Sequence, residues 1–264
     1  MGKKQLERAL QKKQEGNRPL FVPYIMAGDG GLNRLTKRIQ LLEKAGAAAI
    51  ELGIPFTDPV ADGPTIQEAG IRALNNGISL KKILNVLEET KQERTIPIIL
   101  MTYMNPIYAF GVEAFAKAGK EAGVDGVILP DLPLEEERIV REDLQANDIA
   151  HIRLASLTSP LERIKEIAKR SEGFLYAVAV TGTTGAREAN EAGVHAYLQT
   201  LKEYSNVPVL AGFGVSSVKQ AHELSASCDG VIVGSTIVNF LHQEKTEEIR
   251  QLIRDTCQPL NKHL

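Results

Sequence analysis

The chain of 264 residues carries 31 Lys and Arg against 33 Asp and Glu, so its formal net charge at pH 7 is −2. A chain of this length buries a sizeable core without disulfide or metal support, and its balanced charge lacks the broad positive field that nucleic-acid binding uses. Its apolar runs are far shorter than the roughly 20 residues that cross a bilayer, and Cys228 and Cys257 form no C-x-x-C pattern. We therefore expect a cytoplasmic protein with no nucleic-acid partner, no membrane anchor and no disulfide framework.

In chain order, a charged amphipathic segment, residues 3–15, is followed by eight short apolar runs typical of strands that are buried on both faces. Segments with helical spacing, such as 35–45 and 161–168, separate the runs. This alternation predicts an α/β fold, a (β/α)8 TIM barrel in a single domain over residues 1–264, with residues 3–15 as an extra N-terminal helix against its bottom. A doubly wound open sheet is the alternative. The eight runs begin at Leu20, Ala48, Ile96, Val124, Ile149, Phe174, Val207 and Asp229.

Several residues mark where the helices of this barrel should begin and end. Ser159 is expected to cap the helix that Pro160 opens. The acidic cluster 135–137 is expected to open the helix after the fourth strand, in solvent, where negative charge suits the helix dipole. His151, within the fifth strand, is interpreted as a hydrogen-bonded core residue. Helix stops are predicted at Gly46, Gly77 and Gly123.

Polar residues that follow the strands carry the functional interest, because the carboxyl ends of the strands form the active face of such a barrel. Glu51 ends the second strand between Ile50 and Leu52. Burial among apolar neighbours would raise the pKa of its carboxyl and suit it to proton transfer. The alternative is a salt bridge between layers of the barrel. The other polar residues at strand ends are Asp29, Asn105, Asp131 and Thr181.

Asp62 lies in the loop after the second strand, together with Asp58. Three carboxylates, counting Glu51, therefore stand within twelve residues of the chain. Asp62 precedes Gly63-Pro64 and a helical run, so capping that helix is as good an interpretation as a role in the site.

Glycine-rich sequences follow the last three strands: TGTTGAR from Thr181, AGFGVSS from Ala211 and VGSTIV from Val233. Their backbone N–H groups, with the start of a short helix near Gly234-Ser235, are predicted to converge on one phosphate, and tight turns are the alternative. The sequence contains neither a Walker motif nor a complete G-x-G-x-x-G, so no nucleotide is implied. The five histidines lack metal-ligand spacing, and we expect no metal.

The segment of residues 182 to about 193 has few apolar anchors. We expect it to be a mobile lid that becomes ordered over the substrate, with Thr181 at its start and Arg187 accessible to proteases in the free protein.

The longest motif, IELGIPFTDPVADGPTIQ from Ile50, resembles the signature of the tryptophan synthase alpha subunit family. PYIMAGD, MTYMNPIYAFG, GVILPDLPLEE, VTGTTGAR, AGFGVSS and GSTIV occur in the order and spacing of that family and extend the resemblance over nearly the whole chain. Two departures, Gly30 where the family usually has proline and Thr57 where it usually has serine, concern only loop conformation. The resemblance implies a lyase of tryptophan biosynthesis that splits indole-3-glycerol phosphate into indole and glyceraldehyde 3-phosphate by retro-aldol cleavage.

Matched residue by residue, the resemblance makes Glu51 the catalytic acid/base and Asp62 its partner, which accepts the indole N–H. A proton must be added at indole C3 while another leaves the glycerol hydroxyl, and one carboxyl poised near neutrality serves both steps. The resemblance assigns the phosphate to Gly182, Gly212, Gly214, Gly234 and Ser235, and the indole pocket to Phe21, Tyr176 and Phe213.

The family's other half is a beta subunit that carries pyridoxal phosphate (PLP) and receives the indole, so the resemblance implies an alpha2beta2 heterotetramer and no cofactor in this chain. The loops 55–59, with Asp58, and 106–110, after Asn105, fall where the family meets that partner. Two other functions are weighed against this one: a non-catalytic activator of the beta subunit, and another phosphate-binding barrel lyase or isomerase. A pure activator would not need both Glu51 and Asp62.

Overall fold

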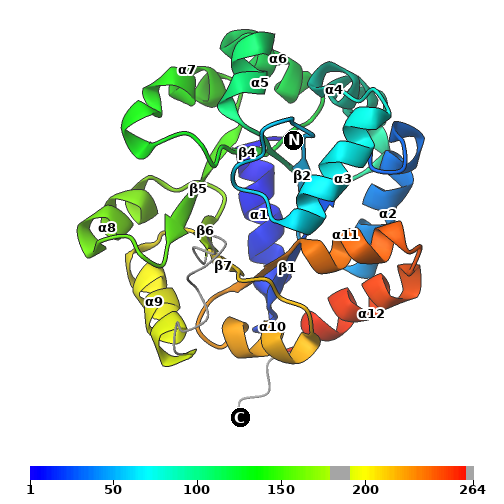
Figure 1. The fold of residues 1–264 in the computed structure, drawn as a ribbon. Coiled ribbons are helices and arrows are strands. Elements are labelled where there is room, and N and C mark those ends of the chain that lie inside the picture. The colour runs from blue at the N-terminus through cyan, green and yellow to red at the C-terminus, as the bar shows by residue number, and fades with distance from the viewer. Residues whose placement is uncertain (179–190, 260–264) are drawn as a thin grey trace.

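Eight parallel strands form a closed barrel in the order β1 to β8 in the computed structural model, which describes residues 1–178 and 191–259. β1 pairs with β2 and also with β8, so the sheet closes on itself. The predicted (β/α)8 TIM barrel is confirmed (Figure 1), and every predicted apolar run contains one strand. The strands are β1 (Leu20–Met26), β2 (Ile50–Gly53), β3 (Ile98–Met101), β4 (Gly126–Ile128), β5 (Ala150–Ser156), β6 (Leu175–Val178), β7 (Val209–Gly212) and β8 (Gly230–Val233).

Helices surround the barrel (Figure 1), and the segments that follow β2, β3 and β8 each contain two α-helices. Short 3-10 helices, η1 (Leu32–Arg34), η2 (Lys91–Glu93) and η3 (Leu134–Glu136), precede or follow some of them. The α-helices of the described ranges are α1 (Lys3–Gln14), α2 (Leu35–Ala45), α3 (Pro64–Asn75), α4 (Leu80–Glu89), α5 (Met104–Phe110), α6 (Val112–Glu121), α7 (Arg138–Ala146), α8 (Leu161–Arg170), α9 (Glu191–Tyr204), α10 (Val218–Ser225), α11 (Ser235–His242) and α12 (Thr246–Thr256).

Side chains alternate between the two faces of each strand, as the period of two in a β-strand requires. On β1, Leu20 and Val22 belong to the cluster that fills the barrel, whereas Phe21 and Ile25 belong to the larger cluster between the strands and the helices. The packed interior holds the strands in register, and it therefore positions their carboxyl ends, which carry the candidate residues. Other members of the interior cluster are Ile99, Ile128, Ile152, Phe174, Leu210 and Ile232.

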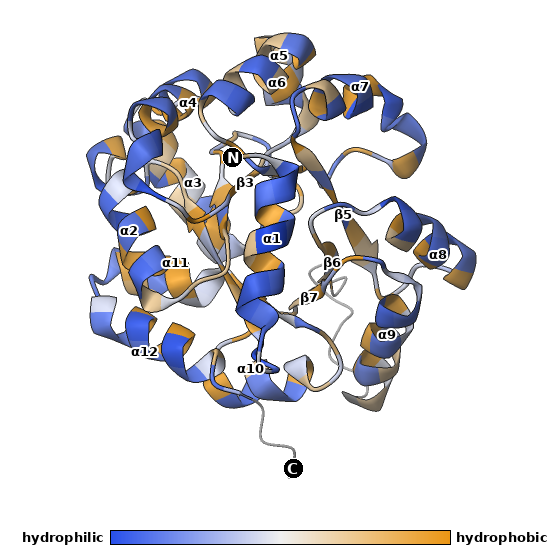
Figure 2. Ribbon diagram, turned by 180° about the vertical axis from the view of Figure 1, so that it is seen from behind, coloured by the Kyte–Doolittle hydropathy of each residue, from blue (hydrophilic) through white to orange (hydrophobic). Residues whose placement is uncertain are grey.

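The helix α1 closes the bottom of the barrel, as predicted (Figure 2). Leu6 and Leu10 are fully buried and pack with the inward-facing residues of the strands. Burial of a leucine side chain contributes about 1.5–3 kcal/mol. The Gly2 N–H donates a hydrogen bond of 2.5 Å to the Asp125 carboxylate and holds the start of the helix in place. Because this end is plugged, a ligand of the barrel interior must enter from the carboxyl ends of the strands.

The helix ends follow the predicted glycines but not the predicted serine cap. Gly46, Gly77 and Gly123 adopt positive φ angles of 108°, 65° and 71° at or just beyond the ends of α2, α3 and α6. The prediction that Ser159 caps α8 is wrong. The N-cap is Pro160, with ψ 150° and no side-chain hydrogen bond, so Ser159 lies one residue outside the capping position.

The prediction of a loop over residues 106–110 is wrong, because they belong to the helix α5. The Asp131 carboxylate accepts hydrogen bonds from the Met104 N–H at 3.0 and 3.1 Å and so stabilises the start of this helix. Pro106 falls in its first turn, where the missing N–H would have no intrahelical acceptor. The apolar residues of this segment therefore stand on a rigid element.

The acidic cluster 135–137 is not uniformly solvated, contrary to expectation. Glu137 is 2% exposed, and its carboxylate forms a bidentate ion pair with Arg153, at 2.5 and 2.9 Å. The neighbouring guanidinium neutralises the carboxylate and makes its burial tolerable. His151 is buried as predicted, and burial lowers its pKa to about 4, but its Nδ1 has no hydrogen-bond partner among the described residues.

Candidate active site

Glu51 lies on β2 between Tyr24 of β1 and Ile99 of β3 in the register of the sheet. Its side chain is fully buried, and neither carboxyl oxygen has a hydrogen-bond partner among the described residues. Within that part of the chain, the alternative of a salt bridge between barrel layers is therefore wrong. Burial, followed by the negative charge of Asp62, raises the pKa of Glu51 from 4.5 to about 8. At neutral pH this carboxyl is mostly protonated and able to donate a proton.

Asp62 lies at the end of the loop between β2 and α3. The N-cap of α3 is Gly63, and no side chain caps the helix, so the capping interpretation of Asp62 is wrong. Its backbone is held on both sides: its N–H donates to the Pro59 carbonyl at 3.0 Å, and its carbonyl accepts from the Gln67 amide at 2.8 Å. Burial raises the pKa of the Asp62 carboxyl to about 6, against the opposing effect of a hydrogen bond with Tyr103.

Three tyrosines surround the two carboxyls. Burial raises the pKa of Tyr24, Tyr103 and Tyr176. The negative charges of Asp62 and Glu51 raise the pKa of Tyr24 and of Tyr176 further, which places all of these groups in one electrostatic environment. Their hydroxyls therefore stay protonated and can donate hydrogen bonds, as the Tyr103 hydroxyl does to Asp62.

Tyr103 also positions the loop that carries Asp62. Its hydroxyl accepts a hydrogen bond from the Ala61 N–H at 3.1 Å. Its ring centre lies 5.4 Å from that of Phe56, with a tilt of 33° between the rings. Because both contacts reach the loop from the end of β3, two neighbouring strands decide where the Asp62 carboxyl lies.

The other polar residues at strand ends have structural partners or face solvent. Asp29 forms a bidentate ion pair with Arg72 of α3, at 2.8 and 2.9 Å, and the Asp131 carboxylate accepts the Met104 N–H at the start of α5. Asn105 and Asp58 are exposed at the active face. Glu51 is thus the strand-end carboxyl that lacks a partner in the described part of the chain. Thr181, Gly182 and Arg187, with most of the predicted lid, lie outside the described residues.

Two of the three glycine-rich sequences meet beyond β7 and β8. The Thr236 hydroxyl of α11 donates a hydrogen bond of 3.0 Å to the Val215 carbonyl, which joins the loop after β7 to the start of that helix. Gly214 is exposed and has a φ of +69°, and the exposed Ser235 is the first residue of α11, directly after Gly234. The N–H groups at a helix start lack intrahelical acceptors and attract anions. This corner of the active face suits a phosphate group.

Phe21 does not lie at the site, and its assignment to the indole pocket is wrong. It is fully buried in the cluster between the strands and the helices, because only every second side chain of β1 points into the barrel. Tyr24, three residues further on, has the inward parity and pairs with Glu51 in the sheet register. The alternation of the strand is the sequence signal that would have selected Tyr24.

Tyr176 reaches the cavity from β6, where it pairs with Leu154 and Leu210. A Cβ atom at Gly212 would overlap the Tyr176 ring, so the glycine leaves room for the aromatic side chain. Phe213 is partly buried, and its ring meets that of Tyr197 edge-on, 6.5 Å away. A role for Phe213 in the pocket stays a prediction.

A cavity of about 750 Å³, a common size for small-molecule sites, opens beside Tyr176 and extends along β4 and β5 as far as Glu137 and Arg153, and neither Glu51 nor Asp62 lines it. Glu51 has no exposed surface, so a substrate must displace neighbouring side chains to reach it. Residues that line the cavity include Ala61, Met101, Leu154, Tyr176 and Gly212. A carboxyl that titrates near neutrality, a second carboxyl in electrostatic range and an anion-binding helix start are the features of a barrel enzyme that moves protons on a small anionic molecule.

Comparison with known proteins identifies the family. The family model described as tryptophan synthase alpha chain matches residues 10–263. A tryptophan synthase alpha chain of Oceanobacillus iheyensis is 56% identical over 256 residues, which are 97% of this chain and 98% of that relative. The chain therefore belongs to the tryptophan synthase alpha chain family, whose members are lyases that cleave indole-3-glycerol phosphate.

Solved structures agree with this assignment. Tryptophan synthase subunit alpha from Legionella pneumophila str. Paris superposes with a TM-score of 0.87 at 33% identity and covers 98% of both chains. A crystal structure of tryptophan synthase from M. tuberculosis, in an aminoacrylate- and BRD0059-bound form, gives a TM-score of 0.86 at 29% identity over 97% of this chain and 98% of the other.

Residues 1–178 and 191–259 contain neither a membrane-spanning helix nor a metal-binding cluster. No helix in these ranges is long and apolar enough to cross a membrane. Nor do three or more His, Cys, Asp or Glu side chains of these ranges gather in a group that would hold a metal ion.

Proposed function

We propose that this chain cleaves indole-3-glycerol phosphate with Glu51 as the acid/base and Asp62 as its partner. The observation that carries this assignment is the Glu51 carboxyl, which is fully buried, has no hydrogen-bond partner among the described residues and has its pKa raised to about 8. An unpaired buried carboxyl costs free energy. The cost is explained if atoms of the substrate supply the missing partners.

The reaction needs one proton to arrive and one to leave. Protonated Glu51 donates its proton to C3 of the indole ring, which becomes an electron-poor indolenine. The Glu51 carboxylate then removes the proton of the neighbouring glycerol hydroxyl, whose oxygen becomes the carbonyl of glyceraldehyde 3-phosphate. The electrons of the broken C–C bond restore the aromatic indole. Glu51 ends protonated, so no external acid or base is consumed.

Asp62 has the complementary role. Its pKa of about 6 leaves it mostly ionised at neutral pH, so it accepts the indole N–H and stabilises the positive charge that develops on the indolenine. The pKa of Glu51 is higher because its burial is deeper and the Asp62 charge lies nearby. The higher pKa thus belongs to Glu51, which must be protonated to act as an acid, and the lower pKa belongs to Asp62, which must be ionised.

The remaining parts of the substrate fit the rest of the face. We assign the indole to the space beside Tyr24 and Tyr176, whose hydroxyls share the environment of both carboxyls. We assign the phosphate to the loops after the last strands, supported by the exposed Gly214 and by the exposed start of α11. The residues of this phosphate site are Gly182, Gly212, Gly214, Gly234 and Ser235.

The chain works without a cofactor of its own and delivers indole to a beta subunit that carries PLP. Two large apolar side chains support a docking surface on the active face: Val60 is 83% exposed and Tyr108 of α5 is 56% exposed. Exposed apolar surface beside the exit of an apolar product favours a docked partner. We infer an alpha2beta2 heterotetramer in the cytoplasm, in which residues 1–264 of each alpha chain form a single domain.

The test is to mix the purified chain with indole-3-glycerol phosphate and to measure indole, with and without a beta subunit. Glu51→Gln is expected to lower indole release by at least about 10²-fold, the scale of a positioned proton-transfer group, while its circular dichroism stays unchanged. Glu88→Gln, at an exposed position of α4, is the matched control. Full activity of a folded Glu51→Gln variant would reject the mechanism. A parent chain that releases no indole but activates the beta subunit would identify a non-catalytic activator.

A further inference from the structure

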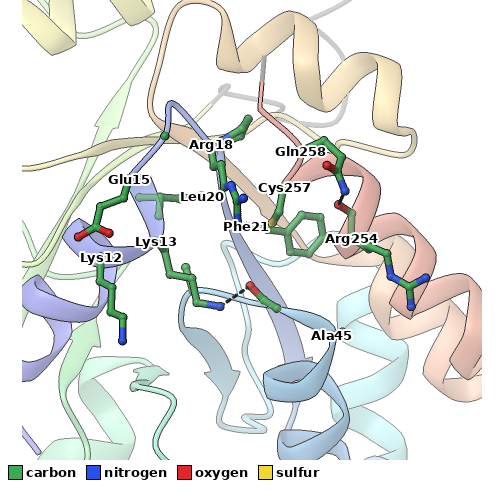
Figure 3. Close-up of a pocket in the computed structure, with 14 residues that line it drawn as sticks. Lys12, Lys13, Glu15, Arg18, Leu20, Phe21, Ala45, Arg254, Cys257 and Gln258 are labelled. Atoms are coloured by element: carbon green, nitrogen blue, oxygen red, sulfur yellow. Dashed lines mark hydrogen bonds between the residues drawn. The ribbon is translucent and has the colours of Figure 1, made fainter. Parts of the chain in front are cut away.

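A second cavity lies at the opposite end of the barrel, beside the plug helix α1. It measures about 550 Å³ and is formed where α1, the start of β1 and the ends of α2 and α12 meet (Figure 3). Its floor is apolar and includes Leu20, Phe21 and Ala48. Its rim is basic and carries Lys12, Lys13, Arg18 and Arg254 against the single carboxylate Glu15.

The charge of this basic cavity is local. Four cations and one carboxylate give its lining a formal charge of +3, although the chain as a whole carries −2. Because salt screens charges over about 8–10 Å, an ion in the cavity responds mainly to charges close to it. The lining of the cavity is therefore cationic, although the chain as a whole is slightly anionic.

The arginines of the basic cavity differ from most others in the chain, which are paired. Arg72 binds Asp29, and Arg153 binds Glu137. In the described part of the chain, neither the Arg18 nor the Arg254 guanidinium has a hydrogen bond or an ion pair, and the same is true of the Lys12 ammonium group. Lys13 is the exception, because its Nζ donates a hydrogen bond of 3.0 Å to the Gly46 carbonyl.

We propose that the basic cavity binds a small phosphate-bearing anion. Two unpaired guanidinium groups supply the forked donors that bind phosphate oxygens in pairs. The volume falls within the range of small-molecule sites, and the apolar floor accommodates an organic group attached to the phosphate. Arg18, which follows α1, and Arg254 of α12 both line this cavity, so its lining comes from segments near both ends of the chain. This site is separate from the active face, since α1 lies between them.

The first test measures the binding of inorganic pyrophosphate by calorimetry at constant ionic strength. The double variant Arg18→Gln/Arg254→Gln is expected to bind at least about tenfold more weakly than the parent, since both forked donors are lost. The matched control is Arg8→Gln/Arg138→Gln, because these two arginines also lack described partners but lie outside the cavity. Unchanged binding in the first variant, or equal weakening in both, would overturn the proposal. Binding of citrate as tight as that of pyrophosphate would overturn the preference for phosphate.

Gly234→Asp separates this site from the phosphate site at the active face. We expect this variant to keep the pyrophosphate binding that Arg18→Gln/Arg254→Gln loses. The opposite pattern would place the anion at the active face and overturn the proposal. Release of indole by the double arginine variant should equal that of the parent.

Cys257 supplies a second, independent measurement, because it lines the basic cavity and is partly exposed. Pyrophosphate is expected to slow its alkylation at least about threefold in the parent, because the bound anion covers the thiol and disfavours the thiolate. No such protection is expected in the double arginine variant. Cys228 is 4% exposed and serves as the internal reference, and Cys257→Ser identifies the signal. Equal alkylation with and without pyrophosphate at matched ionic strength would show that nothing occupies the cavity.

Discussion

The hydroxyl of Tyr24 occupies the space that a side chain on Gly53 would need. Gly53 follows Glu51 by two residues on β2, so both positions share one face of the strand. Tyr24 pairs with Glu51 in the sheet register. The absence of a side chain at Gly53 therefore allows the tyrosine ring to lie across the strand next to the buried carboxyl.

We expect Gly53→Ala to lower kcat/KM for indole-3-glycerol phosphate by at least about tenfold and to cost about 1–3 kcal/mol of stability, because the added methyl group overpacks the site and displaces Tyr24. Gly70→Ala is the control, since a Cβ there makes only an ordinary contact of 3.6 Å with Met26. Steady-state kinetics and urea unfolding measure both effects. If the two variants behave alike, the Tyr24–Gly53 contact has no role in the site.

The raised pKa of Glu51 makes stability depend on pH. The folded chain holds the Glu51 proton up to about pH 8, whereas the unfolded chain loses it near pH 4.5. The stabilisation from protonated Glu51 is therefore complete below about pH 4.5 and is lost as the pH rises towards 8. Glu51→Gln removes this loss, so the stability of the variant relative to the parent should increase with pH over this window.

Urea unfolding of Glu51→Gln and of the parent at several pH values measures this effect. The free energy of unfolding of Glu51→Gln, relative to that of the parent, should increase by a few kcal/mol at pH 8 and above, since one pKa unit corresponds to about 1.4 kcal/mol. Glu88→Gln, on the exposed face of α4, should show no such trend. A difference between Glu51→Gln and the parent that does not change with pH would mean that Glu51 titrates normally.

The proposed roles also predict the pH dependence of the reaction. If Asp62 acts ionised and Glu51 acts protonated, kcat/KM rises with pH through about 6 and falls through about 8. These apparent values belong to the interacting pair rather than to either carboxyl alone. In the Asp62→Asn variant, the kcat/KM of the residual activity should no longer rise with pH on the acidic side, but it should still fall on the alkaline side. A profile that is flat between about pH 5 and 9, once substrate ionisation is allowed for, would reject the assignment.

Gly234 offers a test of the phosphate site. Its φ of −97° suits any residue, and a Cβ there makes only ordinary contacts of 3.7 Å or more. Gly234→Asp is expected to weaken the binding of glyceraldehyde 3-phosphate at least about tenfold more than Gly234→Asn, because the two side chains differ in charge rather than in size. Thermal shifts with the phosphate ligand and with indole compare them. Equal thermal shifts in the two variants would mean that the glycine-rich loops form turns and do not bind phosphate.

The elements of this barrel can be predicted from the sequence, because the signals for them are local. The run that begins at Leu20 predicts β1 to the residue, and Gly46, Gly77 and Gly123 mark helix ends through a backbone conformation that glycine adopts most easily. Glu51 and Asp62 lie within one motif, so the sequence also indicates the two candidate carboxyls. The alternation of side chains along β1 indicates that Tyr24 and Phe21 point to opposite faces of the strand. The register against β2 then shows that Tyr24 is the one that lies beside Glu51.

Which carboxylates are free to react depends on contacts that form in the folded barrel. Asp29 is bound by Arg72, 43 positions away, and Glu137 is buried against Arg153, 16 positions away. The strand-end position of Asp29 looks as functional in the sequence as that of Glu51, and the acidic cluster around Glu137 looks as solvated as any other. Burial and pairing depend on side chains that meet only after the barrel has closed, and both the cost of burying a charge and the pKa shift that results follow from those contacts.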